Sequence, residues 1–200
     1  MILKVCGVTN EGDALLAIEA GALYIGFIIG AKSPRLVDPE IVREISSVFP
    51  RHVKAVGVVD ARKALDLDLV LKSEVRVVQL HWATWERYEE VKEILANYGI
   101  GVALATNSNE GWPLSKLIDV EYFLVDVKDH ERKVQLVNWF RALSPPILGV
   151  AGGLRVENLE VLSGLKVDMV DVSSGIELRP GKKDPRLLRA FAEGVLGRPL

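Results

Sequence analysis

The chain has 200 residues, 49% of them hydrophobic and 26% charged, and its 25 Lys and Arg nearly balance its 27 Asp and Glu, for a formal net charge of −2. This balance argues against nucleic acid or an anionic membrane surface as a partner, because both favour a basic excess. Apolar runs such as 22–29 are shorter than the roughly 20 residues of a membrane span. The single cysteine closes no internal disulfide, so a reducing cytoplasm is the expected location.

Short, β-branched apolar runs alternate with polar turns and amphipathic stretches of helical period along the whole chain. The runs are apolar almost throughout rather than at every second position, which indicates parallel strands covered on both faces. No linker or low-complexity segment divides the sequence, so residues 1–200 are expected to form a single domain. The predicted strands lie at 2–6, 24–28, 53–59, 76–80, 101–105, 122–126, 147–150 and 167–172.

Several helix starts carry their own signals. Aspartate precedes proline at 38–39 and at 184–185, the pattern of a capping carboxylate before the first helical position. Asn10 with Asp13 three residues later resembles a capping box. The spacing of aromatic and aliphatic residues predicts a helix over 85–98. Each predicted helix follows a predicted strand, as a βα unit requires.

Eight strand–helix units in 200 residues favour the α/β class and a closed, parallel (β/α)8 barrel, near the lower size limit of about 200 residues for that fold. The fifth unit is the weakest, because 106–113 is rich in turn residues and only about one helical turn follows. An open, doubly wound sheet is the alternative. It would need a glycine fingerprint after the first strand, and Cys6-Gly7-Val8-Thr9 does not supply one.

In such a barrel the active site lies where the strands end. The loops after the seventh and eighth strands contain Gly152-Gly153 and Ser173-Ser174-Gly175. Glycines let the backbone approach an anion closely, and the serines add hydroxyl and N–H donors. Either motif alone is as typical of an ordinary tight turn. Together, at these two strands, they predict a phosphate site made of Gly152, Gly153, Ser173, Ser174 and Gly175.

Cys6 and Asp126 end two different strands, so they can face each other across the barrel mouth. A thiol in an electropositive pocket serves as a base and a carboxyl group as an acid, the pair that an isomerisation needs. The alternative for Cys6 is an inert core residue. His81 is either a polar group of the site or a structural histidine, and Asp129 is read as a solvated charge. No residues have metal-ligand spacing, so no metal site is expected.

These residues resemble the phosphoribosylanthranilate isomerase family, a barrel enzyme family of tryptophan biosynthesis. The matching segments follow in family order along nearly the whole chain: Lys4-Val5-Cys6-Gly7-Val8-Thr9, Gly26-Phe27, Ser33-Pro34-Arg35, Val78-Gln79-Leu80-His81, Ala151-Gly152-Gly153-Leu154 with Asn158, Val170-Asp171-Val172-Ser173-Ser174-Gly175-Ile176-Glu177, and Gly181-Lys182-Lys183-Asp184.

The resemblance implies an Amadori rearrangement of N-(5-phosphoribosyl)anthranilate to the 1-deoxyribulose 5-phosphate isomer, without a cofactor. Asp126 would protonate the ribose ring oxygen and Cys6 would remove the C2′ proton. Arg35 would orient the anthranilate carboxylate, as a guanidinium fork suits two oxygens. Asp171 would contact a sugar hydroxyl or support its loop, and His81 would belong to the substrate site. The family contains both monomers and homodimers.

The chain departs from the family pattern at two places on the barrel mouth. Residues 127–132 lack the family's glycine-rich loop, and Trp82 stands where a glycine usually follows the histidine of the fourth strand. Two other functions therefore stay open: a non-catalytic phosphosugar-binding paralogue, and a related phosphosugar barrel isomerase of histidine biosynthesis. The histidine-pathway isomerases look built around two aspartates, whereas the first strand of this chain ends in Cys6.

Overall fold

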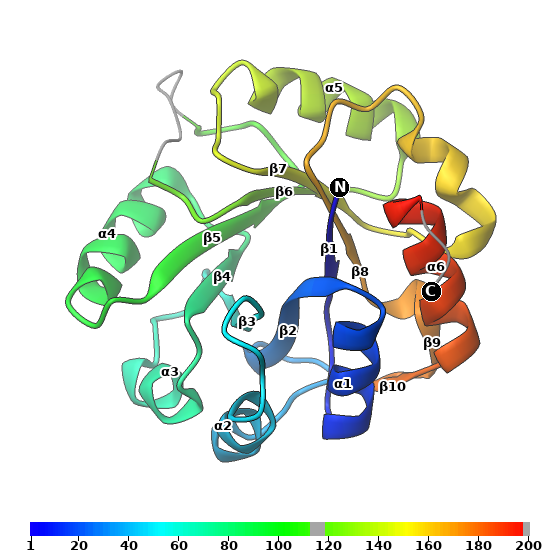
Figure 1. Cartoon of the computed structure of the whole chain (residues 1–200). Helices are drawn as coiled ribbons and strands as arrows, with labels where there is room; N and C mark the ends of the chain where they lie inside the picture. The colour runs from blue at the N-terminus through cyan, green and yellow to red at the C-terminus, as the bar shows by residue number, and fades with distance from the viewer. Residues whose placement is uncertain (113–118, 198–200) are drawn as a thin grey trace.

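The chain forms a closed barrel of eight parallel strands (Figure 1). The computed structural model describes residues 1–112 and 119–197. Strand β1 pairs with β2 on one side and with β8 on the other, which closes the sheet and rules out the open, doubly wound alternative. The strands are β1 (Ile2–Val5), β2 (Ala22–Gly30), β3 (Lys54–Asp60), β4 (Val77–His81), β5 (Gly101–Thr106), β6 (Phe123–Asp126), β7 (Leu148–Ala151) and β8 (Met169–Val172).

Helices surround the barrel, as Figure 1 shows. The predicted caps form: the Asp38 side chain accepts the N–H of Glu40, and the Asp184 side chain accepts the N–H of Arg186. A carboxylate there satisfies an N–H that has no partner inside the helix. The helices are α1 (Glu11–Glu19), α2 (Pro39–Ser46), α3 (Leu67–Ser73), α4 (Trp85–Ala96), α5 (His130–Arg141) and α6 (Pro185–Leu196).

Two connections depart from a simple strand–helix repeat. After β7 the described chain forms short 3-10 turns, η1 (Val156–Leu162), interrupted by a non-helical Asn158. After β8 it forms a 3-10 turn, η2 (Ser174–Ile176), and then an antiparallel hairpin, β9 (Glu177–Arg179) and β10 (Lys182–Lys183), before α6 begins. The short helical turn expected after 106–113 falls on residues 113–118, outside the described part.

The interior of the barrel is mostly apolar but contains a buried polar layer. Valine, alanine, leucine and methionine side chains fill it together with two tyrosines. The ring of Tyr24 meets Tyr122 edge-on at 5.2 Å, and the Tyr122 hydroxyl donates to Gln79 Oε1 at 2.8 Å. The fully buried Lys4 adds a charge to this interior. A buried polar layer of this kind is retained only where its members are paired.

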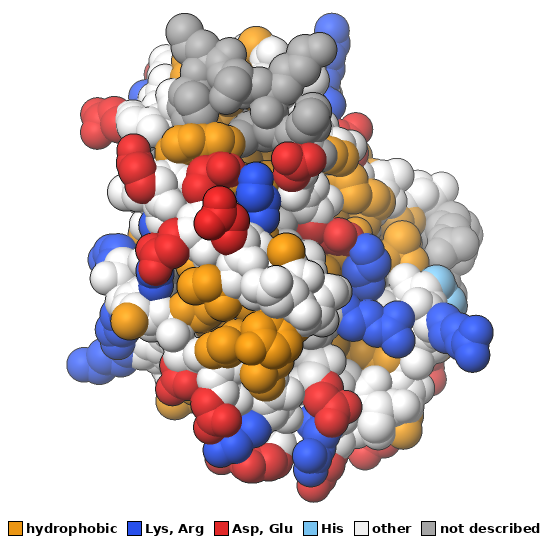
Figure 2. Space-filling view, turned by 90° about the vertical axis from the view of Figure 1, so that its left-hand side faces the viewer, with side chains coloured by type: hydrophobic (Ala, Val, Ile, Leu, Met, Phe, Trp, Pro, Cys, Tyr) orange, Lys and Arg blue, Asp and Glu red, His pale blue; other side chains and the backbone are white. Residues whose placement is uncertain are grey.

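The outer surface agrees with the balanced composition. On the face shown in Figure 2, acidic and basic side chains are interspersed. None of the helices in the described part of the chain is long and apolar enough to span a bilayer.

Candidate active site

A cavity of about 330 Å³ opens at the carboxyl ends of the barrel strands. The barrel brings the predicted residues together there although they come from six different strands and loops. Gly175 is the exception, because it is absent from the described residues that line the cavity. The predicted residues in the lining are Cys6, Arg35, His81, Asp126, Gly152, Gly153, Asp171, Ser173 and Ser174.

Cys6 follows β1, and its N–H donates to Val172 O at 2.8 Å, which fixes the backbone at the mouth. A Cβ on Gly26 would lie 2.8 Å from Cys6 Sγ, so the bare glycine makes room for the sulfur. Burial raises the pKa of the Cys6 thiol, although the ammonium groups of Lys4 and Lys183 act in the opposite direction. The resting residue is therefore a thiol beside positive charge rather than a preformed thiolate.

Beneath Cys6, a buried ion pair joins β1 and β8. Lys4 Nζ lies 2.9 Å from Asp171 Oδ2, and the Lys4 side chain is completely buried. Burial disfavours the ammonium, but the Asp171 carboxylate outweighs it and holds the pKa of Lys4 above its ordinary value. Burial also raises the pKa of Asp171, against the effect of Lys4. The other carboxylate oxygen, Oδ1, is buried without a hydrogen-bond partner, so it is an available acceptor for a substrate hydroxyl.

Asp126 ends β6 next to His81, which ends β4. His81 Nε2 lies 3.0 Å from Asp126 Oδ2. Burial alone would raise the pKa of Asp126, but the hydrogen bond and the charge of His81 outweigh it and hold that pKa below its usual value. The resting Asp126 is a carboxylate. His81 is thus paired with the predicted acid.

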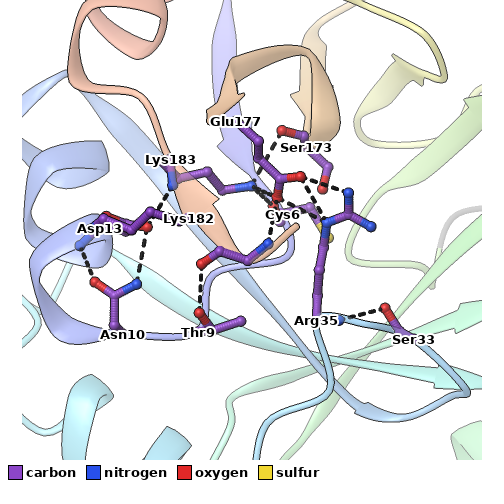
Figure 3. A network of polar contacts seen from close by, with 11 residues as sticks. Cys6, Thr9, Asn10, Asp13, Ser33, Arg35, Ser173, Glu177, Lys182 and Lys183 are labelled. Atoms are coloured by element: carbon purple, nitrogen blue, oxygen red, sulfur yellow. Dashed lines mark hydrogen bonds and ion pairs between the residues drawn. The ribbon is translucent and has the colours of Figure 1, made fainter. Parts of the chain in front are cut away.

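Arg35 belongs to a network that ties the loop after β2 to the β9–β10 hairpin (Figure 3). Its Nε lies 2.8 Å from Glu177 Oε1 and its Nη2 lies 2.6 Å from Glu177 Oε2. Buried Lys183 donates to Glu177 Oε1 at 2.9 Å and to Cys6 O at 2.6 Å. Burial favours a neutral Glu177, but Arg35 and Lys183 hold its pKa below the ordinary range. Glu177 leaves Nη1 of the guanidinium available to another acceptor.

The loops after β7 and β8 approach each other backbone to backbone. A Cβ on Gly175 would lie 1.8 Å from Leu154 O, which explains why glycine stands there although it does not line the cavity. Gly152 has φ +85°, and a Cβ on it would lie 2.7 Å from Asp126 Oδ1. Lys133 reaches out of α5 and donates to Gly152 O at 3.0 Å. These contacts fix the two loops that form one side of the cavity.

The two departures from the family pattern have different structural outcomes. In the segment 127–132, Asp129 is an exposed charge, and its side chain also caps α5 by accepting the N–H of Arg132 at 2.8 Å. Trp82 adopts φ +60°, a left-handed conformation that favours glycine. The residue lines the cavity.

Sequence reasoning did not identify Lys4, Glu177, Lys183 or Lys133 as parts of the site. Lys4 could have been found, because it stands within an apolar predicted strand. A charged side chain on a strand with both faces buried needs a partner. Lys183 and Glu177 fall in matching segments of the family resemblance, but no spacing rule joins them to Arg35. Nothing in the sequence distinguishes Lys133, because helix α5 contains many polar residues.

Comparisons with known proteins identify the family. The family model described as N-(5'phosphoribosyl)anthranilate (PRA) isomerase matches residues 3–194. The N-(5'-phosphoribosyl)anthranilate isomerase of Thermotoga neapolitana is 35% identical over 205 residues, which cover 98% of each chain.

Two solved structures are also similar. A phosphoribosyl anthranilate isomerase in complex with reduced 1-(o-carboxyphenylamino)-1-deoxyribulose 5-phosphate has a TM-score of 0.78 and 32% identity, over 99% of this chain and 100% of that one. Monomers generated from the dimeric enzyme of Thermotoga maritima have a TM-score of 0.76 and 32% identity, over 99% and 100% of the two chains. With its closed barrel and the residues gathered at its mouth, this chain belongs to the N-(5'-phosphoribosyl)anthranilate isomerase family.

Proposed function

We propose that this chain is an isomerase of tryptophan biosynthesis that converts N-(5-phosphoribosyl)anthranilate to 1-(2-carboxyphenylamino)-1-deoxyribulose 5-phosphate, with Cys6 and Asp126 as its acid–base pair. The observation that carries these two roles is that a thiol and a carboxyl group border one cavity, together with glycine and serine loops suited to a phosphate. No cofactor takes part, because the rearrangement only moves protons and electron pairs within one molecule.

In the first step Asp126 donates a proton to the ribose ring oxygen while the C1′–O bond breaks, which gives the open-chain iminium ion. Cys6 then removes the proton from C2′, and the electron pair of that C–H bond moves toward the iminium nitrogen to give an enolamine. Tautomerisation to the ketone moves the hydroxyl proton of C2′ away and adds one proton at C1′. Asp126 and Cys6 thus exchange their protonation states during the reaction, and no atom is gained or lost overall.

The resting protonation of the pair is the reverse of the reactive one, since burial favours a neutral Cys6 and His81 favours an ionised Asp126. Both forms carry one proton between the two groups, so their ratio does not change with pH, and only the form with thiolate and carboxylic acid reacts. We expect kcat/KM to be bell-shaped, falling at low pH when Cys6 and Asp126 are both protonated and at high pH when neither is.

The remaining parts of the substrate find complementary groups. The phosphate would lie at Gly152, Gly153, Ser173 and Ser174, with Lys128 at the same rim as a counter-charge. Asp171 Oδ1 would accept a sugar hydroxyl, which gives a partner to an oxygen that otherwise has none. Nη1 of Arg35 would donate to the anthranilate carboxylate while Glu177 holds the rest of the guanidinium.

The test is turnover of the fluorescent substrate by the wild type and by Cys6→Ala and Asp126→Asn, with rescue of a tryptophan auxotroph lacking this step. Each substitution should lower kcat by about 10²-fold or more, as general acid–base catalysis contributes that much. If both variants keep wild-type turnover, the assigned roles are wrong. Binding of a product analogue without turnover by the wild type would favour the phosphosugar-binding paralogue. Turnover of the histidine-pathway aminoaldose instead would favour the other isomerase.

Three further predictions concern the whole protein. We expect residues 1–200 to act as one domain and the enzyme to work in the cytoplasm. We expect it to bind a small phosphosugar substrate and to bind neither nucleic acid nor a membrane. The related enzyme of Thermotoga maritima is dimeric, and light scattering after size-exclusion chromatography would distinguish a monomer from a homodimer here.

A further inference from the structure

Trp82 combines an unfavourable backbone conformation with an exposed aromatic ring beside the active site. Its φ of +60° is in the region where a side chain is costly and glycine is favoured. The residue is 40% exposed, which leaves a large apolar surface in contact with solvent. It lines the same cavity as Cys6 and Asp126. Backbone strain of this kind concentrates at functional sites, where it is often part of the mechanism.

The indole is held in one orientation by its neighbours. The Arg62 guanidinium lies 4.3 Å from the centre of the Trp82 ring, a cation–π contact. Arg62 is itself fixed by Asp60, with its Nε 2.9 Å from Oδ1 and its Nη2 2.8 Å from Oδ2. The ring of His81 meets the indole at 4.5 Å in a tilted arrangement. An aromatic ring oriented before binding loses little freedom when a ligand packs on it.

The order of the strands in the barrel indicates which part of a substrate meets this ring. Strand β4, which precedes Trp82, lies four places from β8 in the closed barrel and therefore on the opposite side of the mouth. A phosphate at the Ser173 and Gly153 loops directs the other end of the substrate across the cavity, away from β7 and β8. From β2, its following loop and β3, between β8 and β4 in the barrel order, the same lining also includes apolar Ile28, Ala31 and Val58, a surface suited to an aryl ring.

We propose that Trp82 forms a wall on which the aryl ring of the substrate packs, so that it strengthens the binding of the aromatic amine at this site. This inference rests on the proposed function. Aromatic rings attract one another in offset or edge-to-face geometry beyond the area that they bury. Trp82 is a positioning residue: it takes no part in proton transfer and acts by holding C1′ and C2′ between Asp126 and Cys6.

The experiment compares two inert ligands that differ only in the arylamine: reduced 1-(o-carboxyphenylamino)-1-deoxyribulose 5-phosphate and ribitol 5-phosphate. Calorimetric titration of Trp82→Gly should show the first bound about 5- to 20-fold more weakly than by the wild type, as the loss of one aromatic contact predicts. The affinity for ribitol 5-phosphate should stay within about twofold, because the sugar phosphate does not reach the indole. Trp82→Phe should restore most of the arylamine affinity.

Tyr98→Ala is the matched control, because Tyr98 is an exposed aromatic residue near the end of α4, outside the cavity lining. It should leave both affinities unchanged. Circular dichroism checks that each variant is folded. Equal weakening of both ligands by Trp82→Gly, or unchanged arylamine affinity, would overturn the proposal. Absence of turnover by the wild type would instead overturn the proposed function, and the two titrations would still decide the role of Trp82.

Discussion

Replacement of Lys4 by methionine tests the electrostatics of the barrel interior. At 2.9 Å and an effective dielectric constant of about 20, the attraction between Lys4 and Asp171 is about 6 kcal/mol. Desolvation of the two charges offsets much of it, but removing one partner leaves a buried, unpaired carboxylate. We expect Lys4→Met to lower the free energy of unfolding by about 3–5 kcal/mol at neutral pH, measured by urea denaturation.

The loss of unfolding free energy in Lys4→Met should depend on pH, and the direction follows from the pKa of Asp171. The pKa of Asp171 in the folded protein already lies above the ordinary value of 3.8 because of burial, and without Lys4 it rises further. A group with a raised folded pKa contributes stability below its unfolded pKa, and that contribution is lost as the pH rises through the folded pKa. The deficit of Lys4→Met should therefore be greatest at neutral pH and shrink as the pH approaches 3.8.

Lys72→Met is the matched control. Its ion pair with Asp68 has the same distance of 2.9 Å but lies on the surface of α3, so its removal should leave stability nearly unchanged. Asp171→Asn in the Lys4→Met background should recover part of the loss, because a neutral amide is less costly to bury. A deficit below about 1 kcal/mol, or one that does not vary with pH, would refute the argument that burial controls this pair.

Two further predictions concern the mouth of the barrel. His81→Asn removes the group that lowers the pKa of Asp126, so the acidic limb of the kcat/KM profile should move to higher pH. An unmoved limb would show that His81 does not control this carboxyl group. Gly175→Ala introduces a Cβ 1.8 Å from Leu154 O and should raise KM by about tenfold or more by separating the loops after β7 and β8, whereas Gly12→Ala in α1 should leave KM unchanged. Wild-type KM in Gly175→Ala would contradict the close approach of these loops.

Strands and helices could be predicted from the sequence where the local pattern of apolar and capping residues agrees with the element that forms in the folded chain. The run at 101–105 became β5 (Gly101–Thr106), and Asp38 and Asp184 cap the helices that they precede. The β9–β10 hairpin was not predicted, because strands of two or three residues are too short to show a period. The expected helix after β7 is only the 3-10 turns of η1, where Asn158 interrupts the helix and donates from its side chain to Gly153 O.

The sequence by itself determined the order of strands and helices and the set of side chains at the carboxyl ends of the strands, because hydrophobic period and capping chemistry act over a few neighbouring residues. Only the tertiary structure decided which charges meet and which groups are protonated. Lys4 and Asp171 are 167 positions apart, and Arg35 and Glu177 are 142 apart. Burial and charge pairing depend on these long-range contacts, so the resting thiol of Cys6 and the resting carboxylate of Asp126 follow from the closed barrel.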